Sequence, residues 1–485
     1  MVLVRRKRGT VRAMRTSIGL DVGTTSVKGV ALSEDGEVVA TAEEEFPLST
    51  PRPGWAEQDP ELWWRATEAV LGALDVSEPA GIGLAGQMHG LVPLGAGDEV
   101  LRPAILWNDQ RTELQCGEIE ARVGVERLID LTGNRALTGF TAPKLLWMRD
   151  EEPDLFTRIE SVLLPKDYVR LRLTGDKVTD VADASGTLLF DVAERRWSEQ
   201  VLSALELPAE WLPPVMESPE RSAETAAGVP VAAGAGDQAS GALGVGVTHA
   251  GGPLSVVLGT SGVVFAALPG YATEPEARVH TFCHSVPGIW HAMGVMLSAA
   301  GSLRWLRDLF GDVSFPQLTD EAAAWPVGAE GLWFQPYLAG ERTPHADAHA
   351  RGSFTGLSLR HDRGALARAV LEGVAFGLRD SLDLVRDLGV DASRARVSGG
   401  GARSQTWLEI VASVLDLPLE RTAVDEGAAY GAALLGGVAG GVWADAEEAV
   451  QTCVRVSGVV EPDPELVTVY EEMLPHYREL YPVLN

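Results

Sequence analysis

Hydrophobic and polar residues alternate along the first half of the chain with two different periods. From Ser17 to about Val247, short apolar runs that are typical of β-strands alternate with helical patterns. For example, a helical pattern extends from Leu62 to Leu74, and a strand-like run, Gly81–Leu84, follows it. This order predicts an α/β domain over 17–247, ending near the Gly/Ala-rich stretch 234–246.

A second domain is predicted over 248–485. Its strongest helical pattern extends from Gly364 to Leu388, with a strand and the Gly-rich turn Ser398–Gly401 after it. The apolar positions of that helix are Leu366, Val370, Val374, Leu378 and Leu382. We therefore expect two α/β domains joined near Val247.

Two short Gly-Thr loops occupy similar places in the two predicted domains. Asp21–Thr25 follows the apolar run Ile18–Leu20, and Leu258–Gly262 follows Leu254–Val257. Each pattern predicts strand, tight turn and strand. The repetition indicates an internally duplicated chain that closes on ATP, although either loop alone is equally typical of an ordinary hairpin.

The composition of these loops favours phosphate binding. Glycine leaves no side chain between the backbone N–H groups and an anion, and threonine hydroxyls add donors. The first loop also begins with an acid, Asp21, at a predicted strand end. A carboxylate there can orient a hydrated Mg²⁺ ion.

Overall composition narrows the class of protein. The 485 residues are 46% hydrophobic, which is enough for two or three globular domains, and the formal net charge is −28. That charge argues against a nucleic-acid or anionic-membrane surface. The three cysteines, Cys116, Cys283 and Cys453, do not indicate a disulfide framework, so we expect an acidic cytoplasmic enzyme.

Residues 1–16 differ in composition from the rest of the chain. They contain six arginines and lysines and no acid, and they lack the apolar core of a secretory signal. We expect a disordered basic extension, with Met14 as a possible true start and a transit peptide as the alternative. No segment of the sequence is long and apolar enough to span a membrane.

Two further patterns match known site types incompletely. Gly81–Gly86 fits the GxGxxG pattern of dinucleotide-binding sites, but no helix of the required length follows, so we interpret these glycines as part of a buried strand. His280, Cys283, His284 and His291 fit no standard zinc spacing. We interpret those four as core and turn residues.

Asp237 is the candidate catalytic base. It lies among small residues, where the backbone can approach a ligand closely. A kinase that acts on a hydroxyl aligns the alcohol, accepts its proton with a carboxylate and neutralises charge on the γ-phosphoryl group. The alternative is an Asx-turn or helix N-cap. Gln87 and His89, after a predicted strand, are suited either to binding a small polyol or to a structural role.

Several short motifs, in this order, resemble the FGGY carbohydrate kinases from about Ser17 to Val442. These motifs are Gly54–Pro60, Gly86–Gly90, Leu106–Asp109, Leu164–Tyr168, Gly340–His345 and Ser398–Ser404. The resemblance is strongest to bacterial members that act on xylulose. It implies two actin-like ATPase (ribonuclease H-like) α/β domains, with the active site in the cleft between them.

The resemblance also implies roles for individual residues. Asp237 is expected to be the general base and, with Asp21, to position Mg²⁺. The sugar would contact Gln87, Met88, His89, Trp107, Asp237 and Gln238. ATP would contact Thr24, Thr25, Lys28, Gly259, Thr260, Gly400, Gly401 and Ser404.

The expected reaction is ATP-dependent phosphorylation of D-xylulose at its 5-hydroxyl. Met88-His89 replaces the Arg-Glu pair of glycerol kinases, which favours a pentulose, whereas Gln238 stands where members that act on xylulose usually carry Asn. Ribulose, another ketose or glycerol therefore remain alternatives. So do a non-catalytic actin-like scaffold and, from the glycine pattern alone, an NAD-dependent dehydrogenase. A homodimer is a family-based expectation.

A second departure lies at Asp425–Gly431, where the family often has a proline and a leucine. We expect this difference to affect packing alone.

Overall fold

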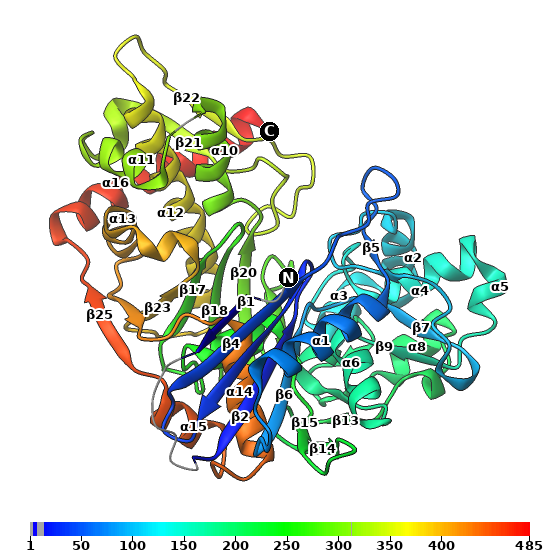
Figure 1. Cartoon of the computed structure of the whole chain (residues 1–485). Helices are drawn as coiled ribbons and strands as arrows, with labels where there is room; N and C mark the ends of the chain where they lie inside the picture. The colour runs from blue at the N-terminus through cyan, green and yellow to red at the C-terminus, as the bar shows by residue number, and fades with distance from the viewer. Residues whose placement is uncertain (1–2, 7–13, 312) are drawn as a thin grey trace.

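The computed structural model describes residues 3–6, 14–311 and 313–485, arranged as two halves that each contain a large β-sheet (Figure 1). The N-terminal half carries the strands β1 (Leu3–Arg6), β2 (Thr16–Val22), β3 (Ser26–Ser33), β4 (Val38–Glu45), β5 (Glu57–Gln58), β6 (Gly81–Gly86), β7 (Val92–Leu94), β8 (Ala104–Ile105), β9 (Ser161–Leu163), β10 (Thr179–Asp180), β11 (Phe190–Asp191), β12 (Arg196–Trp197), β13 (Val215–Met216), β14 (Arg221–Glu224), β15 (Pro230–Ala232) and β16 (Ala235–Gly236). Its helices are α1 (Pro60–Leu74), η1 (Ala96–Asp98), α2 (Glu113–Val123), α3 (Val125–Thr132), α4 (Thr141–Glu151), α5 (Pro153–Phe156), α6 (Pro165–Thr174), α7 (Val181–Ser185), α8 (Glu199–Leu205), η2 (Ala209–Trp211) and α9 (Asp237–Gly244).

Most of the C-terminal half lies at the upper left of Figure 1, whereas its helices α14 and α15 lie below, beside the N-terminal sheet. Its strands are β17 (Leu254–Leu258), β18 (Gly262–Leu268), β19 (His280–Cys283), β20 (Trp290–Met296), β21 (Trp333–Gln335), β22 (Ser353–Thr355), β23 (Ala395–Ser398), β24 (Leu419–Thr422) and β25 (Val456–Val460). Its helices are α10 (Ala300–Phe310), α11 (Phe315–Ala323), η3 (Val327–Gly331), α12 (Arg363–Asp387), η4 (Gly400–Arg403), α13 (Gln405–Leu415), α14 (Ala428–Ala439), α15 (Ala446–Cys453) and α16 (Pro464–Leu484).

The two large sheets share one strand order. In the N-terminal sheet, β4-β3-β2 is antiparallel and continues into the parallel pairs β2-β6 and β6-β15. In the C-terminal sheet, β20-β18-β17 is antiparallel and continues into β17-β23 and β23-β24, which are parallel. The first Gly-Thr loop joins β2 to β3, and the second joins β17 to β18, which hold corresponding places in the two strand orders. The predicted internal duplication is therefore confirmed.

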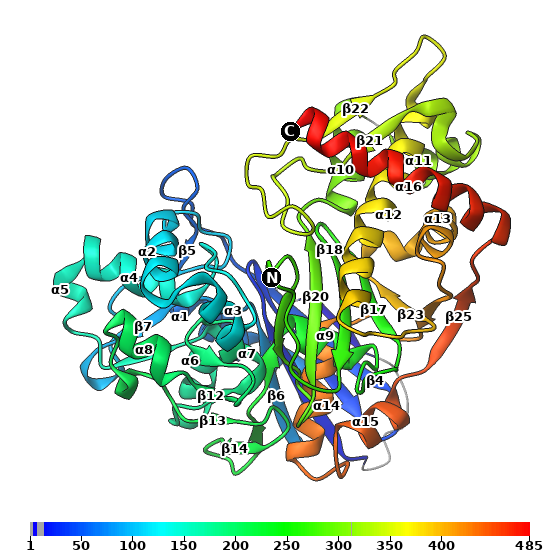
Figure 2. The ribbon, with the colours of Figure 1, turned by 180° about the vertical axis from the view of Figure 1, so that it is seen from behind.

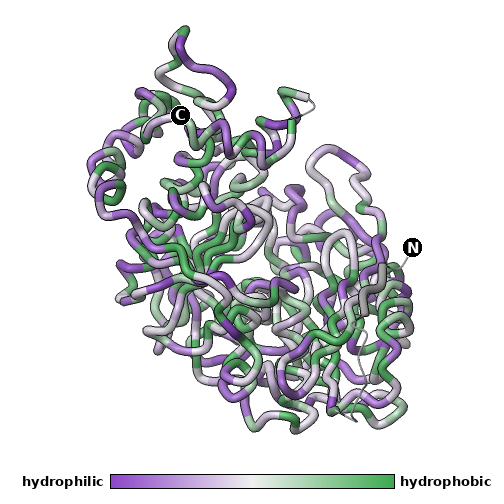
Figure 3. The backbone as a smooth tube through the Cα atoms, turned by 60° about the vertical axis from the view of Figure 1, so that its left-hand side comes forward, coloured by the Kyte–Doolittle hydropathy of each residue, from purple (hydrophilic) through white to green (hydrophobic). Residues whose placement is uncertain are grey.

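The central strands of both halves are buried among apolar side chains. The strands β17, β18 and β20 are mostly buried and form the apolar centre of the C-terminal half (Figure 3). The predicted helix after Gly364 is confirmed as α12, whose N-cap Asp362 accepts a hydrogen bond from Ala365 N at 3.1 Å. The predicted helix that ends at Leu74 is confirmed as α1, which Asp59 caps.

Helix α14 packs on the N-terminal sheet, although it follows the C-terminal strands in the sequence (Figure 2). Glycines on the strands allow the helix backbone to come close. A Cβ added at Gly83 would lie 1.8 Å from Ala432 O, and one at Gly19 would lie 2.0 Å from Ala429 O. The glycines of 81–86 therefore belong to a wholly buried strand, β6, as predicted.

The packing of α14 and α15 crosses the predicted division at Val247. Helices α14 and α15 complete the N-terminal core with Val30 and Leu32, and the chain then returns to the C-terminal sheet as β25. A second difference concerns the predicted disordered extension. Leu3–Arg6 forms β1, which pairs antiparallel with β4, and residues 1–2 and 7–13 lie outside the described residues.

None of the helices in the described ranges has both the length and the apolar character that crossing a membrane requires.

Candidate active site

The strands β2, β6 and β16 bring Asp21 and Asp237 together. Asp21 and Ala235 pair with Ala85 of β6 from its two sides, in parallel register. The carboxyl ends of the three strands therefore meet at one edge of the sheet, where ligands bind in open α/β folds. Asp237 begins α9, with Gly236 as the N-cap, so its carboxylate does not cap the helix.

Burial raises the pKa of both acids, and the charge of Asp21 raises that of Asp237 further. Burial, followed by the charge of Asp21, raises the pKa of Asp237 to about 7, against hydrogen bonds from Gln238 that lower it. Burial raises the pKa of Asp21 to about 6, although Lys28 opposes the shift. A carboxylate with a pKa near neutrality suits a general base.

A cavity of about 220 Å³ opens beside the two acids. Its walls come from the end of β2, from α9, from β17 and β18, and from the segment that precedes α14. The polar and charged residues of the lining are Asp21, Asp237, Gln238, Ser255, Ser398, Asp425, Glu426 and Tyr430. The cavity therefore joins the two halves of the molecule.

Met88 and His89 lie directly after β6. Met88 is buried against Gly236, where an added Cβ would be 2.7 Å from Met88 Cγ, so it reaches the start of the Asp237 helix. His89 has a φ of +70°, which L-residues rarely adopt, and Lys144 Nζ and Thr141 Oγ1 donate to its carbonyl at 2.8 and 3.0 Å. This strained backbone, held from two sides, is typical of a ligand-binding position.

Gln87, Thr24 and Trp107 form one hydrogen-bonded group. Thr24 Oγ1 donates to Gln87 Oε1 at 3.2 Å and accepts from Trp107 Nε1 at 3.0 Å, and Gln87 Nε2 donates to Gly23 O at 3.2 Å. Gln87 is thus directed to the first Gly-Thr loop. This contact links the predicted sugar-binding residues to a predicted phosphate-binding loop.

The second Gly-Thr loop lies against the Gly-rich turn of the same half. A Cβ added at Gly399, where φ is +88°, would be 3.0 Å from Gly259 N, and one at Gly401 would be 2.8 Å from Leu258 Cβ. Thr260 O accepts from Ala299 N at 2.8 Å, ahead of α10. The structure therefore brings together the predicted nucleotide-binding residues Gly259, Thr260, Gly400, Gly401 and Ser404, the last as the N-cap of α13.

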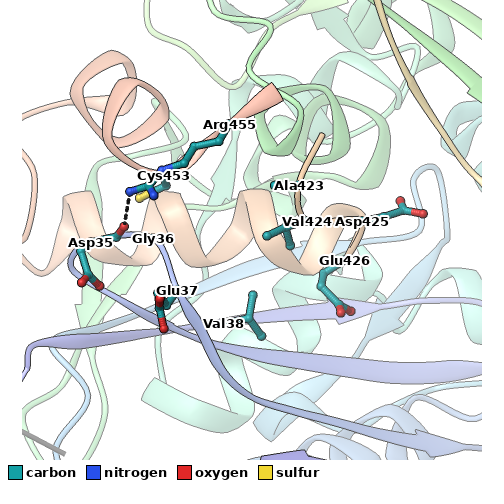
Figure 4. A pocket seen from close by; sticks show the side chains of 10 residues that line it. All are labelled: Asp35, Gly36, Glu37, Val38, Ala423, Val424, Asp425, Glu426, Cys453 and Arg455. Atoms are coloured by element: carbon teal, nitrogen blue, oxygen red, sulfur yellow. Dashed lines mark hydrogen bonds between the residues drawn. The ribbon is translucent and has the colours of Figure 1, made fainter. Parts of the chain in front are cut away.

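Lys28, a predicted phosphate ligand, pairs with an acid from the other end of the sequence. Its Nζ lies 2.7 Å from Glu426 Oε2. Figure 4 shows Glu426 beside Asp425 at one end of a second pocket, of about 400 Å³, that also includes Asp35 and Arg455. No local pattern in the sequence indicates this ion pair, because 398 positions separate its members.

The sequence analysis missed three cations near these residues: Lys144 and Lys166, which are buried, and Arg342, which is half-buried. Lys144 holds the backbone of His89, and Lys166 lies 2.6 Å from Asp167 and 2.8 Å from Asp180 within a fully buried cluster below Gly86. Arg342 reaches Gly139, next to the predicted sugar-binding residues. Lys166 and Arg342 belong to two motifs of the family resemblance, which was the available signal.

The segment Asp425–Gly431 has contacts beyond packing, since Glu426 pairs with Lys28 and lines the cavity. Its largest buried side chain is Tyr430. This side chain is buried, and its hydroxyl donates to Cys453 O at 3.0 Å. It thereby ties α14 to α15.

Comparison with known proteins agrees with this geometry. The model of the N-terminal domain of the FGGY family of carbohydrate kinases matches residues 16–244, and that of the C-terminal domain matches residues 254–440. A xylulose kinase of Escherichia coli strain K12 is 44% identical over 481 residues, which cover 96% of this chain and 98% of the relative. One from Lactococcus lactis is 39% identical, with 96% of each chain covered.

The solved structures give the same result. The crystal structure of xylulose kinase from Rhodospirillum rubrum superposes with a TM-score of 0.90 at 33% identity, and the match covers 97% of this chain and 99% of that one. The two-domain architecture is therefore shared along nearly the whole length.

Proposed function

Because the chain belongs to the FGGY family of carbohydrate kinases, we propose that it transfers the γ-phosphoryl group of ATP to the 5-hydroxyl of D-xylulose. The sugar O5 forms a bond to the γ-phosphorus as the bond from that phosphorus to the β,γ-bridging oxygen breaks. The O5 proton passes to a carboxylate, and ADP leaves. Xylulose 5-phosphate and ADP are the products.

The observation that carries the proposal is the pair of acids in the cavity. Asp237 lies at the start of α9 with a pKa near 7, so its carboxylate is able to accept the hydroxyl proton at neutral pH. Met88 packs against Gly236, the residue before Asp237, so the two proposed sugar ligands lie near each other. We propose His89, Trp107 and Gln238 as further sugar ligands.

The nucleotide is proposed to lie between the two Gly-Thr loops, with its phosphates near Thr24, Thr25, Lys28, Gly259 and Thr260. The Gly-rich turn Gly400–Ser404 would border the adenosine. These segments offer backbone N–H groups without intervening side chains.

Asp21 and Asp237 fit a Mg²⁺ ion that is held mainly by phosphate oxygens and water. Asp21 Oδ1 is buried and has no hydrogen-bond partner among the described residues, and no group of three His, Cys, Asp or Glu side chains there is arranged to hold a metal by itself. Mg²⁺ commonly binds through one or two carboxylates and the substrate phosphates. When bound, it would neutralise charge on the transferred group.

A coupled ADP-release assay tests this function. D-xylulose, D-ribulose, L-ribulose and glycerol are compared on the wild type and on Asp237→Asn, with Asp176→Asn, an exposed surface acid, as the matched control. We expect the highest kcat/KM with D-xylulose and a loss of about 10³-fold in Asp237→Asn. A higher kcat/KM with another acceptor would overturn the substrate, and no turnover with any acceptor would favour a nucleotide-binding scaffold.

The homodimer expected from the family also remains a proposal. Light scattering at several concentrations tests it.

A further inference from the structure

The segment that carries Arg342 is fixed to the C-terminal sheet on both sides of this residue. Glu341 Oε1 accepts from Leu297 N at 2.8 Å, immediately after β20. Thr343 Oγ1 donates to Arg278 O at 2.7 Å and accepts from Val295 N at 3.0 Å. Because both neighbours are anchored, the direction of the Arg342 side chain is set by the fold.

Arg342 points from the C-terminal half toward the sugar side of the N-terminal half. A Cβ added at Gly139 would lie 3.6 Å from Arg342 Nη2 and 2.6 Å from Trp107 O. The ring of the next residue, Phe140, packs edge-on against His89 at 4.8 Å between centroids and against His280 at 6.0 Å. The charge of Arg342 acts on both histidines.

The guanidinium of Arg342 has no ion-pair or hydrogen-bond partner within the part of the chain that the structure describes. A half-buried cation without a partner is costly, and arginine, with five N–H donors, has no acceptor of its own. The side chain is therefore available to an acceptor that is not part of the protein.

The two neighbouring histidines are fixed as acceptors. Burial lowers the pKa of His89 well below its usual value, and burial with the charge of Arg342 lowers that of His280 to about 3, so both rings are neutral. His89 Nδ1 lies 2.5 Å from Gly186 O, and a carbonyl oxygen can only accept. Nδ1 therefore carries the proton, and His89 Nε2 is an acceptor.

The same reasoning applies to His280. Asn134 Nδ2 donates to Thr132 O and Thr281 O, so Asn134 Oδ1 is the atom that faces His280 Nδ1 at 2.6 Å. His280 Nδ1 therefore donates, and its Nε2 is left as an acceptor. Arg342 is the donor of this group of three.

A ketose has a carbonyl group at C2, whereas the corresponding polyol has a hydroxyl group there. A site made of hydrogen-bond donors and acceptors can distinguish these two groups. Each hydroxyl can donate to a histidine nitrogen, whereas the C2 carbonyl of an open-chain ketose accepts only. Phosphorylation at the 5-hydroxyl requires that hydroxyl to be free of the ring, which leaves the carbonyl exposed to recognition.

We propose that Arg342 is a specificity-determining residue that donates to the carbonyl oxygen of the open-chain ketose, while His89 and His280 accept from its hydroxyls. The proposal rests on the proposed function and deepens it. It explains how the C-terminal half takes part in sugar recognition. A site that hydrogen-bonds a polar substrate group discriminates strongly against an analogue that presents a different one.

The test compares a ketose with the polyol formed by reducing its carbonyl. The wild type, Arg342→Gln and Arg342→Lys are assayed with D-xylulose, D-ribulose, xylitol and ribitol, with Arg360→Gln, from an exposed ion pair with Glu330, as the control. We expect Arg342→Gln to lose about 100-fold in kcat/KM for the preferred ketose, mainly through KM. We expect little change for the polyols or in the KM for ATP.

A binding measurement separates recognition from folding. Calorimetry without ATP should show weaker ketose binding to Arg342→Gln, with an intermediate loss in Arg342→Lys. The Tm should not fall, because no protein partner of Arg342 is lost. If the wild type phosphorylates no ketose, the proposed function and this inference both fail. If it does, and Arg342→Gln affects ketose and polyol equally or leaves ketose binding unchanged, this inference alone is wrong.

Discussion

At the residue scale, the proposed proton transfer depends on two carboxylates that lie far apart in the sequence and that the fold brings together. Asp21 and Asp237 lie on either side of β6, and the charge of Asp21 makes ionisation of Asp237 less favourable. The reactivity of Asp237 is therefore a property of the pair.

The first prediction concerns pH. Because the base proposed here, Asp237, accepts a proton only when it is ionised, kcat/KM should rise with pH through an apparent pKa of about 7. Asp21→Asn removes a negative charge near Asp237 and should therefore lower the pKa of Asp237. The acidic side of the pH–rate profile should move to lower pH, even if the rate is low. Glu43→Gln is the control, because Glu43 acts on Asp21 and is not among the main influences on Asp237. If the acidic side of the pH–rate profile does not move in Asp21→Asn, the prediction is wrong.

The second prediction concerns stability. The pKa of Asp237 in the folded state, about 7, exceeds its ordinary value of 3.8, so ionisation costs stability as pH rises between these values. The cost is absent below about pH 4 and complete above about pH 7. Asp237→Asn should therefore raise the Tm by about 2–5 °C at pH 8 and by less at pH 5. Calorimetry at both pH values checks this, and an equal gain at both would refute it.

The third prediction concerns Lys28. We assign Lys28 to the phosphates, but its Nζ is paired with Glu426 Oε2 at 2.7 Å. Glu426→Gln should free Lys28 and lower the KM for ATP by about 3–10-fold at low salt, with the sugar KM unchanged. Asp425→Asn is the matched control, since Asp425 is exposed and no ion pair with Lys28 is recorded for it. Equal effects of the two variants would show that general charge, not this pair, matters.

At the element scale, close contact between α14 and β6 holds the floor of the site in place. The backbone of α14 occupies the space that side chains on β6 would need, which is why β6 carries glycines there. Helix α14 also packs on α9, which carries Asp237. The position of Asp237 thus depends on a helix that begins 191 residues later.

The fourth prediction tests this contact. Gly83→Ala would place a Cβ 1.8 Å from Ala432 O, a backbone atom that cannot move alone, so we expect a loss of roughly 3 kcal/mol or more. Gly72→Ala in α1 is the control, because no atom lies within 4 Å of its added Cβ. That variant should be more stable by about 0.5–1 kcal/mol. Urea unfolding measures both, and similar stabilities would refute the packing argument.

At the scale of the whole molecule, the two halves are duplicates in topology but not independent in packing. The chain crosses back after Gly427, so that α14 and α15 cover the N-terminal sheet before β25 rejoins the other one. The cavity beside Asp21 and Asp237 draws its lining from both halves.

The fifth prediction follows from that crossing. The fragment 14–247 would expose the apolar residues of β3 and α9 that α14 and α15 cover, including Val30, Leu32 and Leu243. We expect it to aggregate or to bind hydrophobic dyes, with no cooperative unfolding transition. Size-exclusion chromatography and calorimetry, with the full chain as reference, check this. A monomeric fragment that unfolds cooperatively would contradict it.

The sequence by itself determined the elements and the family. Hydrophobic periodicity predicted α1 and α12, and glycines with threonines marked the two turns, because these signals depend on neighbours within a few residues. The strand interpretation of 81–86 also followed from local pattern. The order of short motifs then identified the family, which the comparisons confirm.

Tertiary structure alone decided which distant groups meet. The repulsion between Asp21 and Asp237, the pair Lys28–Glu426 and the approach of Arg342 to Gly139 all join segments far apart in the chain. The packing of α14 on the N-terminal sheet has the same character. No local pattern encodes such contacts, because they arise from burial and strand register, and these depend on the whole fold.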